Sequence, residues 1–198
     1  MEDETTKILS SLATTPDAWL IKSIHLFDCA DNIFERSSGL YRETYQRIVA
    51  NKDTSCIKDA TSYLQVGLLL AGYGFETIMK YAYIKENIES IQINILDKKI
   101  LPNILVNTKS HDLIEFSKHI NYLPKLNLRH FLKILSEHIK WAGRYPIPKK
   151  SSEFENATDT LYWYEGHVNT YYDLRNDIFT FLGLDYDQLL NFGIGLSS

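Results

Sequence analysis

A stripe of apolar residues near the C-terminal end of the sequence constrains the fold more than any other feature. Its members recur three and four residues apart, so they lie along one side of an α-helix, and such a side packs against a core or a partner helix. The stripe consists of Leu161, Tyr164, Val168, Tyr171, Arg175, Ile178 and Leu182. We therefore expect a long helix over 158–184 that is buried along this side.

Arg175 is the charged member of this stripe, and a guanidinium is costly to bury unless it is paired, solvated in a cleft or shared across an interface. The structural interpretation is a buried ion pair with Glu76, the acid embedded in the most apolar segment. The functional interpretation is an arginine that faces a phosphate in a dimer cleft. We favour the ion pair, because Asp173 and Asp177 beside Arg175 would repel an anion.

Apolar patterns elsewhere predict further helices and therefore an all-α bundle. Residues 56–86 are apolar on nearly all sides, as expected of a central helix. Gly67, Ala71 and Gly74 share one face of this helix, where small side chains let another helix approach closely. A later helix is expected to begin at His111-Asp112, with Asp112 in its first turn.

The segments on either side of the central helix show weaker patterns. Before it, we expect a helix over 16–36 that ends at Ser37-Ser38-Gly39, and then a second helix over 40–50. After it, isoleucines alternate with polar residues from residue 91, and a further apolar stretch is broken by Pro102. This alternation predicts a small irregular or β-hairpin insertion at about 90–107.

Size and composition indicate one soluble domain over 1–198. The chain has 198 residues, of which 44% are hydrophobic, which is enough for a substantial core. Its two cysteines, Cys29 and Cys56, form neither a CxxC motif nor a disulfide framework, which favours a reducing compartment. The N-terminus is acidic where a signal peptide would be basic, and the longest apolar run is too short to span a bilayer. We therefore expect a cytoplasmic protein without a membrane segment.

Charge is distributed unevenly along the chain. Residues 118–150 carry eight lysines and arginines against one acid, whereas residues 157–198 carry six acids against one arginine. The basic segment could bind an anion such as nucleic acid, or the two segments could be neighbours that neutralise each other. The candidate anion-binding residues, several of them on a helix expected over 128–139, are Arg129, Lys133, Lys140, Arg144, Lys149 and Lys150.

Short catalytic and metal-binding signatures are missing from the sequence. It contains no Gly-rich phosphate loop, dinucleotide fingerprint, HExxH motif or nucleophile elbow. The histidines on predicted helices, His111 with His119 and His130 with His138, are eight residues apart, too far for a one-turn metal-binding pair. We therefore expect neither a metal centre nor a cofactor.

Four short motifs together resemble the HEPN superfamily, whose members are all-α, often dimeric domains of toxin–antitoxin and phage-defence systems. The motifs are the segment 72–80 (GYGFETIMK), Ser110-His111-Asp112-Leu113, Gly143-Arg144-Tyr145-Pro146 and Arg175-Asn176. The resemblance implies a HEPN-like helical bundle with its core at about 55–185. It also implies a homodimer or another protein partner, and a prokaryotic defence or toxin–antitoxin context.

The resemblance bears directly on catalysis. Catalytically active HEPN members cleave RNA with an Arg that is followed a few residues later by a His, and Arg175 with Asn176 matches the beginning of that pattern. Thr180, Phe181 and Leu182 occupy the positions where the His would stand, and none of them is a general acid or base at neutral pH. We therefore expect a non-catalytic interaction module that dimerises, with RNA as its candidate ligand.

Two alternatives stay open. The first is a metal-independent HEPN ribonuclease in which Arg175 and Asn176 act with a histidine from elsewhere in the chain, such as His111 or His167. The second is a domain that binds a small anion or a nucleotide through the basic segment. Digestion of RNA, salt-sensitive binding of RNA, or neither, would separate these functions.

Overall fold

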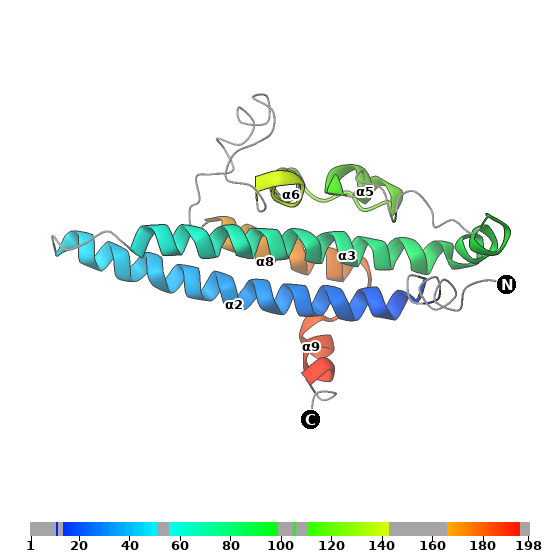
Figure 1. Ribbon diagram of the computed structural model, residues 1–198, viewed down its shortest axis with the longest axis horizontal. Helices are drawn as coiled ribbons and strands as arrows, with labels where there is room; N and C mark the ends of the chain where they lie inside the picture. Colours follow the sequence, from blue (N-terminus) through cyan, green and yellow to red (C-terminus); the bar gives the residue numbers. More distant parts are fainter. Residues whose placement is uncertain are drawn as a thin grey trace.

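The computed structural model describes residues 11, 14–50, 56–98, 105, 111–142 and 166–194, and within them the regular structure is helical with no β-strand. Two long antiparallel helices, α2 (Pro16–Val49) and α3 (Cys56–Lys98), lie side by side along the longest dimension of the molecule (Figure 1). Shorter helices surround this pair: α5 (Leu113–His119), α6 (Leu126–Glu137), the π-helical turn η2 (His138–Ala142), α8 (Gly166–Phe181) and α9 (Tyr186–Ile194). The predicted all-α bundle is therefore confirmed. None of the described helices combines the length and the apolar composition that crossing a lipid bilayer requires.

Glycines on α3 allow α2 to approach it closely, as the sequence predicts. A Cβ atom placed on Gly67 would lie 2.7 Å from the ring of Phe34, and one on Gly74 would lie 2.7 Å from the ring of Phe27. Both distances are well below van der Waals contact, so a larger side chain would force the two helices or the two rings apart. The small-residue face of α3 is therefore the surface that packs on α2.

Helix α2 continues through the position where the sequence predicts a break. Residues 16–49 form one helix, so the expected end at Ser37-Ser38-Gly39 is wrong. Ser37 and Thr44 are buried, and Thr44 satisfies its hydroxyl by donating to the carbonyl oxygen of Leu40 at 2.7 Å. Packing against α3 along the whole length of α2 outweighs the low helix propensity of serine and glycine.

Helix α3 bends at Asn87 and then continues to Lys98. Asn87 has non-helical dihedral angles (φ −118°, ψ 17°), and its Nδ2 donates to the carbonyl oxygen of Tyr83 at 2.9 Å. The β-hairpin expected at about 90–107 is wrong over 91–98, because these residues are helical. Ile84 and Ile91 are spaced for one side of a helix and pack together with Leu105, which explains the helix. Apart from Leu105, residues 99–107 lie outside the described residues.

Helices α5 and α6 pack on α3, on the side away from α2 (Figure 1). Asp112 caps the N-terminus of α5 by accepting a hydrogen bond from the backbone N–H of Glu115 at 3.1 Å, so it precedes the first turn. The backbone N–H of Leu113 donates to the Ser136 hydroxyl at 3.0 Å, which joins α5 to α6. These contacts hold the two short helices as one layer over α3.

Aromatic side chains from four helices form the centre of the core. The ring of Phe27 lies 4.9 Å from that of Phe75 and 5.9 Å from that of Phe179, between ring centroids. Phe179 in turn lies 5.2 Å from Tyr186. All three pairs are edge-to-face, the arrangement that aromatic quadrupoles favour. The contacts join α2, α3, α8 and α9.

The predicted C-terminal stripe is buried in the part that the structure describes. Tyr171, Arg175 and Ile178 of α8 are buried, and Val168 and Leu182 are partly buried. The first two members of the stripe precede α8 and lie outside the described residues. The central prediction for this segment, a helix with one buried side that includes an arginine, is confirmed over 166–181.

A glycine separates α8 from α9 and sets the direction of the last helix. Gly183 has a positive φ of 66°, and the backbone N–H of Leu184 donates to the carbonyl oxygen of Phe179 at 2.9 Å. This pattern is a Schellman motif, which ends a helix at a residue that tolerates the left-handed conformation. Helix α9 then packs against α2.

Candidate functional site

Arg175 forms its ion pair with Asp31 of α2 and not with Glu76. Its Nη1 donates to Asp31 Oδ2, and the Arg175 side chain is 10% exposed against 25% for Asp31. The expected pair with Glu76 is wrong in its partner, although Arg175 and Glu76 are both buried as predicted. The reason is the packing of α8: its Arg175 side meets α2 at Asp31, whereas Glu76 of α3 is held by other groups.

Tyrosine side chains enclose the Asp31–Arg175 pair. The Arg175 guanidinium lies 3.9 Å from the ring centroid of Tyr186 and 5.1 Å from that of Tyr172, so it makes cation–π contacts with both. The Tyr171 hydroxyl donates to Asp31 Oδ1 at 2.7 Å. Burial raises the pKa of Asp31, and the nearby guanidinium opposes this by favouring the carboxylate. The arginine is thus fixed by contacts within the protein.

Glu76 contacts Lys80 and His111 where α3 meets the start of α5. Its Oε1 accepts from Lys80 Nζ at 2.7 Å, one helical turn along α3. Its Oε2 lies 2.8 Å from Nδ1 of His111, just before α5. The Lys80 ammonium also lies 5.2 Å from the ring centroid of Trp19. This cluster fastens the start of α5 to the central helix.

The remaining catalytic candidates lie in separate surroundings. His167 is buried against Phe131 of α6, with ring centroids 5.8 Å apart, and burial together with His130 lowers its pKa. Asn176 is exposed, although its neighbour Arg175 is buried. Among the described residues, no contact joins Arg175 to His111 or to His167. The structure therefore does not assemble these side chains into one centre.

Metal ligation has no basis in the described part of the chain. Across those residues, no group of three or more histidine, cysteine, aspartate or glutamate side chains is placed to bind a metal ion.

The cations of the basic segment divide into paired and unpaired members. Lys118 lies 2.6 Å from Glu115, and Lys140 lies 3.4 Å from Asp112 and 3.5 Å from Glu137. These acids neutralise part of the segment, but they lie within 112–137 and not in the acidic segment 157–198, and no ion pair joins the described residues of the two segments. Three further candidates, Arg144, Lys149 and Lys150, lie outside the described residues.

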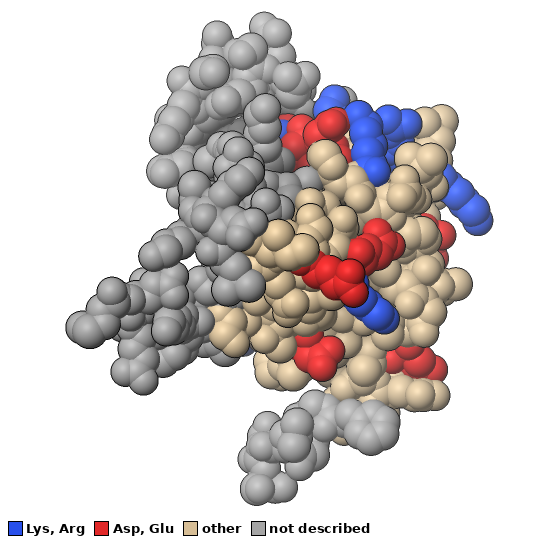
Figure 2. Space-filling view, turned by 90° about the vertical axis from the view of Figure 1, so that its right-hand side faces the viewer, with Lys and Arg blue, Asp and Glu red and all other residues tan. Residues whose placement is uncertain are grey.

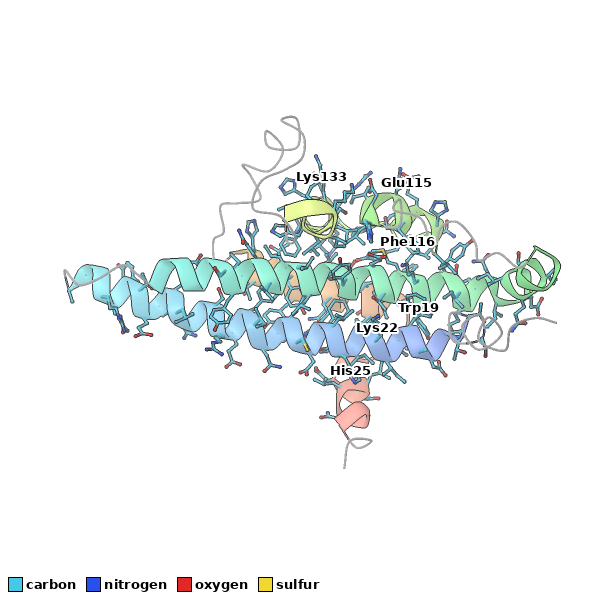
Figure 3. The ribbon with its side chains drawn as sticks, in the orientation of Figure 1. Trp19, Lys22, His25, Glu115, Phe116 and Lys133 are labelled. Atoms are coloured by element: carbon cyan, nitrogen blue, oxygen red, sulfur yellow. The ribbon has the colours of Figure 1, made fainter. Side chains whose placement is uncertain are left out.

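Three exposed cations form what we call the α6 cationic row: Lys125, Arg129 and Lys133. They are spaced four residues apart, so they lie on one side of α6 at intervals of about 6 Å. No ion pair joins them to any acid in the described ranges. Lys133 points away from α3 into solvent (Figure 3). The row is therefore free to meet an external anion.

The start of α6 adds a second feature to this row. Lys125 is the N-cap residue, and it makes no side-chain capping hydrogen bond to the first turn of the helix. Backbone N–H groups at such a position, together with the helix dipole, favour an anion. His130 is also exposed beside Arg129. Seen from one end of the molecule, most of the visible lysine and arginine lies at the top, on the side of α5 and α6, with some acidic side chains beside it and further acids toward the middle and bottom (Figure 2).

Two contacts of these clusters are absent from the sequence-based predictions. Asp31 carries no local sign of its role, since nothing in α2 marks it as the acid that meets Arg175. Lys80 does carry one, because it follows Glu76 by four residues on a predicted helix, the spacing of a favourable ion pair. The unpaired state of Lys125 depends on the position of every acid nearby, which no local pattern gives.

Models of known protein families, curated proteins and solved structures were each compared with the chain, and no match was found among them. The function must therefore be inferred from the geometry of its own residues.

Proposed function

We propose that this chain is a non-catalytic, HEPN-like interaction module that binds RNA through the α6 cationic row. The observation that carries the proposal is that Lys125, Arg129 and Lys133 are aligned, exposed and unpaired within the described residues. Neighbouring lysines of the same segment are, by contrast, neutralised by acids. A row of cations at regular spacing suits a polyanion, whose phosphates repeat along the strand.

The surroundings of Arg175 support a structural role for it. A catalytic arginine must reach the scissile phosphate, whereas Arg175 is buried, paired with Asp31 and covered by Tyr186. The same position in the HEPN pattern is followed by Thr180 where a histidine would stand. We therefore assign Arg175 to the stability of the fold and RNA binding to α6.

The cellular setting in this proposal comes from the resemblance and from composition. A cytoplasmic location, a homodimer and a prokaryotic defence or toxin–antitoxin context are part of it. Each stays a prediction, and the oligomeric state is the one most easily measured, by light scattering on the purified chain.

Salt dependence of RNA binding tests the proposal. A fluorescently labelled single-stranded RNA should bind with an affinity that falls as salt rises, with a slope of about 0.7 in log–log form for each phosphate contact. The triple variant Lys125→Gln, Arg129→Gln, Lys133→Gln should therefore lower that slope by about 2. Anisotropy titrations at several salt concentrations measure it.

A matched triple variant controls for net charge. Lys22→Gln, Arg42→Gln, Lys85→Gln removes the same number of cations from exposed positions on α2 and α3. Under the proposal, this control keeps the wild-type slope. An equal loss in both triple variants would show that binding follows net charge, and unchanged binding in the α6 variant would remove the row from the function. Displacement of the RNA by inorganic phosphate at low concentration would instead favour a small-anion site.

A further inference from the structure

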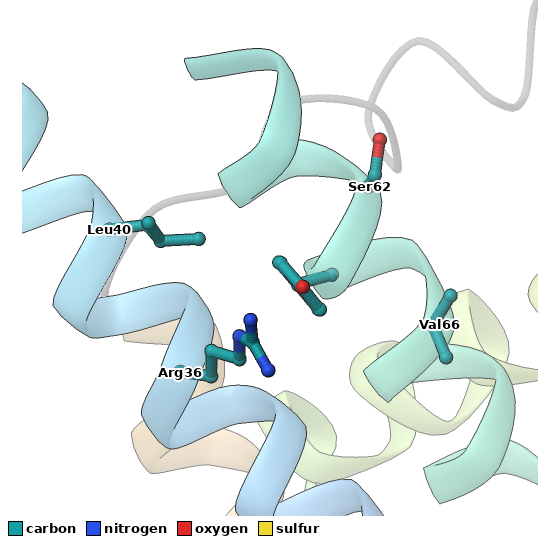
Figure 4. A pocket seen from close by; sticks show the side chains of 5 residues that line it. Arg36, Leu40, Ser62 and Val66 are labelled. Atoms are coloured by element: carbon teal, nitrogen blue, oxygen red, sulfur yellow. The ribbon is translucent and has the colours of Figure 1, made fainter. Parts of the chain in front are cut away.

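A hollow lies between α2 and α3, apart from the α6 cationic row. It has a volume of about 430 Å³ and is lined by Arg36, Leu40, Ser62, Tyr63 and Val66 (Figure 4). This volume is within the range of small-molecule sites in proteins. The lining contains one cation, two hydroxyl groups and apolar side chains, a mixture typical of such sites.

The packing of the helix pair explains why the hollow forms here. At Gly67 the missing side chain lets the ring of Phe34 sit against α3, as described above. One turn earlier on α3, the corresponding residue is Tyr63 and not a glycine. Its ring contacts the Arg36 guanidinium of α2 and not a buried aromatic ring. The side chains of the two helices therefore interlock at Gly67 and leave space beside Tyr63.

The guanidinium of Arg36 has N–H donors available for a carboxylate. Its Cζ lies 4.6 Å from the ring centroid of Tyr63, so the guanidinium rests on the ring. A guanidinium donates through N–H groups that lie in its own plane, so a contact through its face leaves those donors available. No ion pair or hydrogen bond joins Arg36 to another residue of the described chain.

The neighbouring arginines of α2 differ from Arg36 in this respect. Arg47 pairs with Glu43 at 2.5 Å, and Arg42 donates through Nε to the carbonyl oxygen of Ser38 at 3.4 Å. The acid next in sequence, Glu35, is exposed and does not line the hollow. The lining of the hollow itself contains no acid. An anion entering it would therefore meet the positive charge of Arg36 and, among the residues that line the hollow, no negative charge.

The walls of the hollow fit an apolar body. Val66 is 47% exposed, and Leu40 and Tyr63 are partly buried, so apolar surface faces the opening. Covering such surface with an aromatic ring is favourable, at about 25 cal/mol for each Å² removed from water. We propose that the hollow binds a small aromatic carboxylate, with its carboxylate on Arg36 and its ring against Leu40 and Val66.

Naphthoate is a suitable probe, with naphthylmethanol as its neutral counterpart. Titration of each into isotopically labelled protein, followed by amide chemical shifts, should give saturable changes around residues 36–40 and 62–66. For a ligand of this size we expect a dissociation constant on the order of 1 mM. Because the carboxylate forms charge-assisted hydrogen bonds, the alcohol should bind roughly tenfold more weakly or worse.

Variants separate the ionic contact from simple adsorption. Arg36→Gln should weaken naphthoate binding to the level of the alcohol and leave the alcohol unchanged. Val66→Trp, which fills the hollow from an exposed position, should abolish binding of both compounds. Arg42→Gln is the matched control on the same helix and should keep the wild-type affinity for both.

Three results would overturn the proposal. These are the absence of saturable shifts at the two segments, naphthoate binding that is insensitive to Arg36→Gln, and an equal loss in Arg42→Gln. Thermal unfolding of each variant establishes that it is folded, and Arg36 and Val66 are exposed, so wild-type stability is expected. RNA binding by the Arg36 variant should be unchanged, because the hollow and the α6 row are formed by different helices.

Discussion

Arg175 joins two helices whose contacting residues are 144 positions apart in the sequence. Removing either member of the Asp31–Arg175 pair leaves a buried or half-buried charge without its counter-charge. We therefore expect Arg175→Met or Asp31→Asn to lower the free energy of unfolding by on the order of 3 kcal/mol. A double-mutant cycle from urea unfolding should give a coupling above about 1 kcal/mol, because the two side chains are in direct contact.

A second cycle, Arg175→Met with Glu76→Gln, serves as the control. Glu76 is held by Lys80 and His111, so its substitution should add to that of Arg175 within about 0.5 kcal/mol. Strong coupling to Glu76 together with none to Asp31 would contradict the contacts described here.

His138 makes stability depend on pH below neutrality. Its ring is buried and its Nδ1 lies 3.1 Å from the carbonyl oxygen of Ile134. Burial lowers the pKa of His138, more than nearby Glu137 and the backbone bond raise it, and His167 lowers it further. The unfolded chain, where histidine titrates near 6.5, then binds more protons than the folded one. Stability is therefore full above about pH 6.5 and falls as the pH drops below that value.

Thermal unfolding between neutral and mildly acidic pH measures this effect. Each pH unit below the unfolded pKa should remove up to about 1.4 kcal/mol for one such histidine. His138→Gln should reduce the loss of stability at mildly acidic pH and leave the part that comes from His167, whose pKa is also lowered, whereas His119→Gln, at an exposed position, should leave the profile as in the wild type. A profile that is the same in all three proteins would show that His138 does not titrate differently on folding.

At the level of the helices, replacement by alanine should change the free energy of unfolding in opposite directions at two glycines in helix interiors. Gly74→Ala places a methyl group 2.7 Å from the buried ring of Phe27, and such overpacking costs typically about 1–3 kcal/mol. Gly39→Ala meets nothing within 4 Å and gains helix propensity, so it should stabilise α2 by about 0.5–1 kcal/mol. Urea unfolding of both variants makes the comparison. Stabilisation by Gly74→Ala would mean that α2 and α3 are not in close contact there.

Considered as a whole, the molecule presents most of the lysine and arginine visible in Figure 2 on the side of α5 and α6, with acids beside them there and further acids toward the middle and bottom. Its catalytic candidates are distributed among different contacts, so we expect the purified chain to leave labelled RNA intact during prolonged incubation without added metal. Gel analysis of the RNA measures this. Cleavage that is lost in Asn176→Ala, an exposed substitution that should not disturb folding, would establish the ribonuclease alternative instead.

Helix positions could be read from the sequence because they depend on spacing between neighbours. The central helix, its small-residue face and the buried side of α8 all follow from residues three and four apart. The errors arose where two local patterns competed. Alternating isoleucines from Ile91 onward suggested a strand, yet Ile84 and Ile91 also fit a helix, and burial beside Leu105 favours the helix. Likewise, Ser37-Ser38-Gly39 suggested the end of a helix, yet packing on α3 keeps these residues helical.

Which charged residues form ion pairs could not be predicted from the sequence in the same way. Asp31 and Glu76 are both acids within helices of the core. The sequence favours Glu76 as the partner of Arg175, because the segment around Glu76 is more apolar. Which of them meets Arg175 depends on how α8 is placed against α2 and α3, and that placement comes from many distant side-chain contacts acting together. The same holds for the unpaired α6 row and for the hollow at Arg36. Coulombic pairing and cavity shape depend on distance in space, which is established only once the helices have packed.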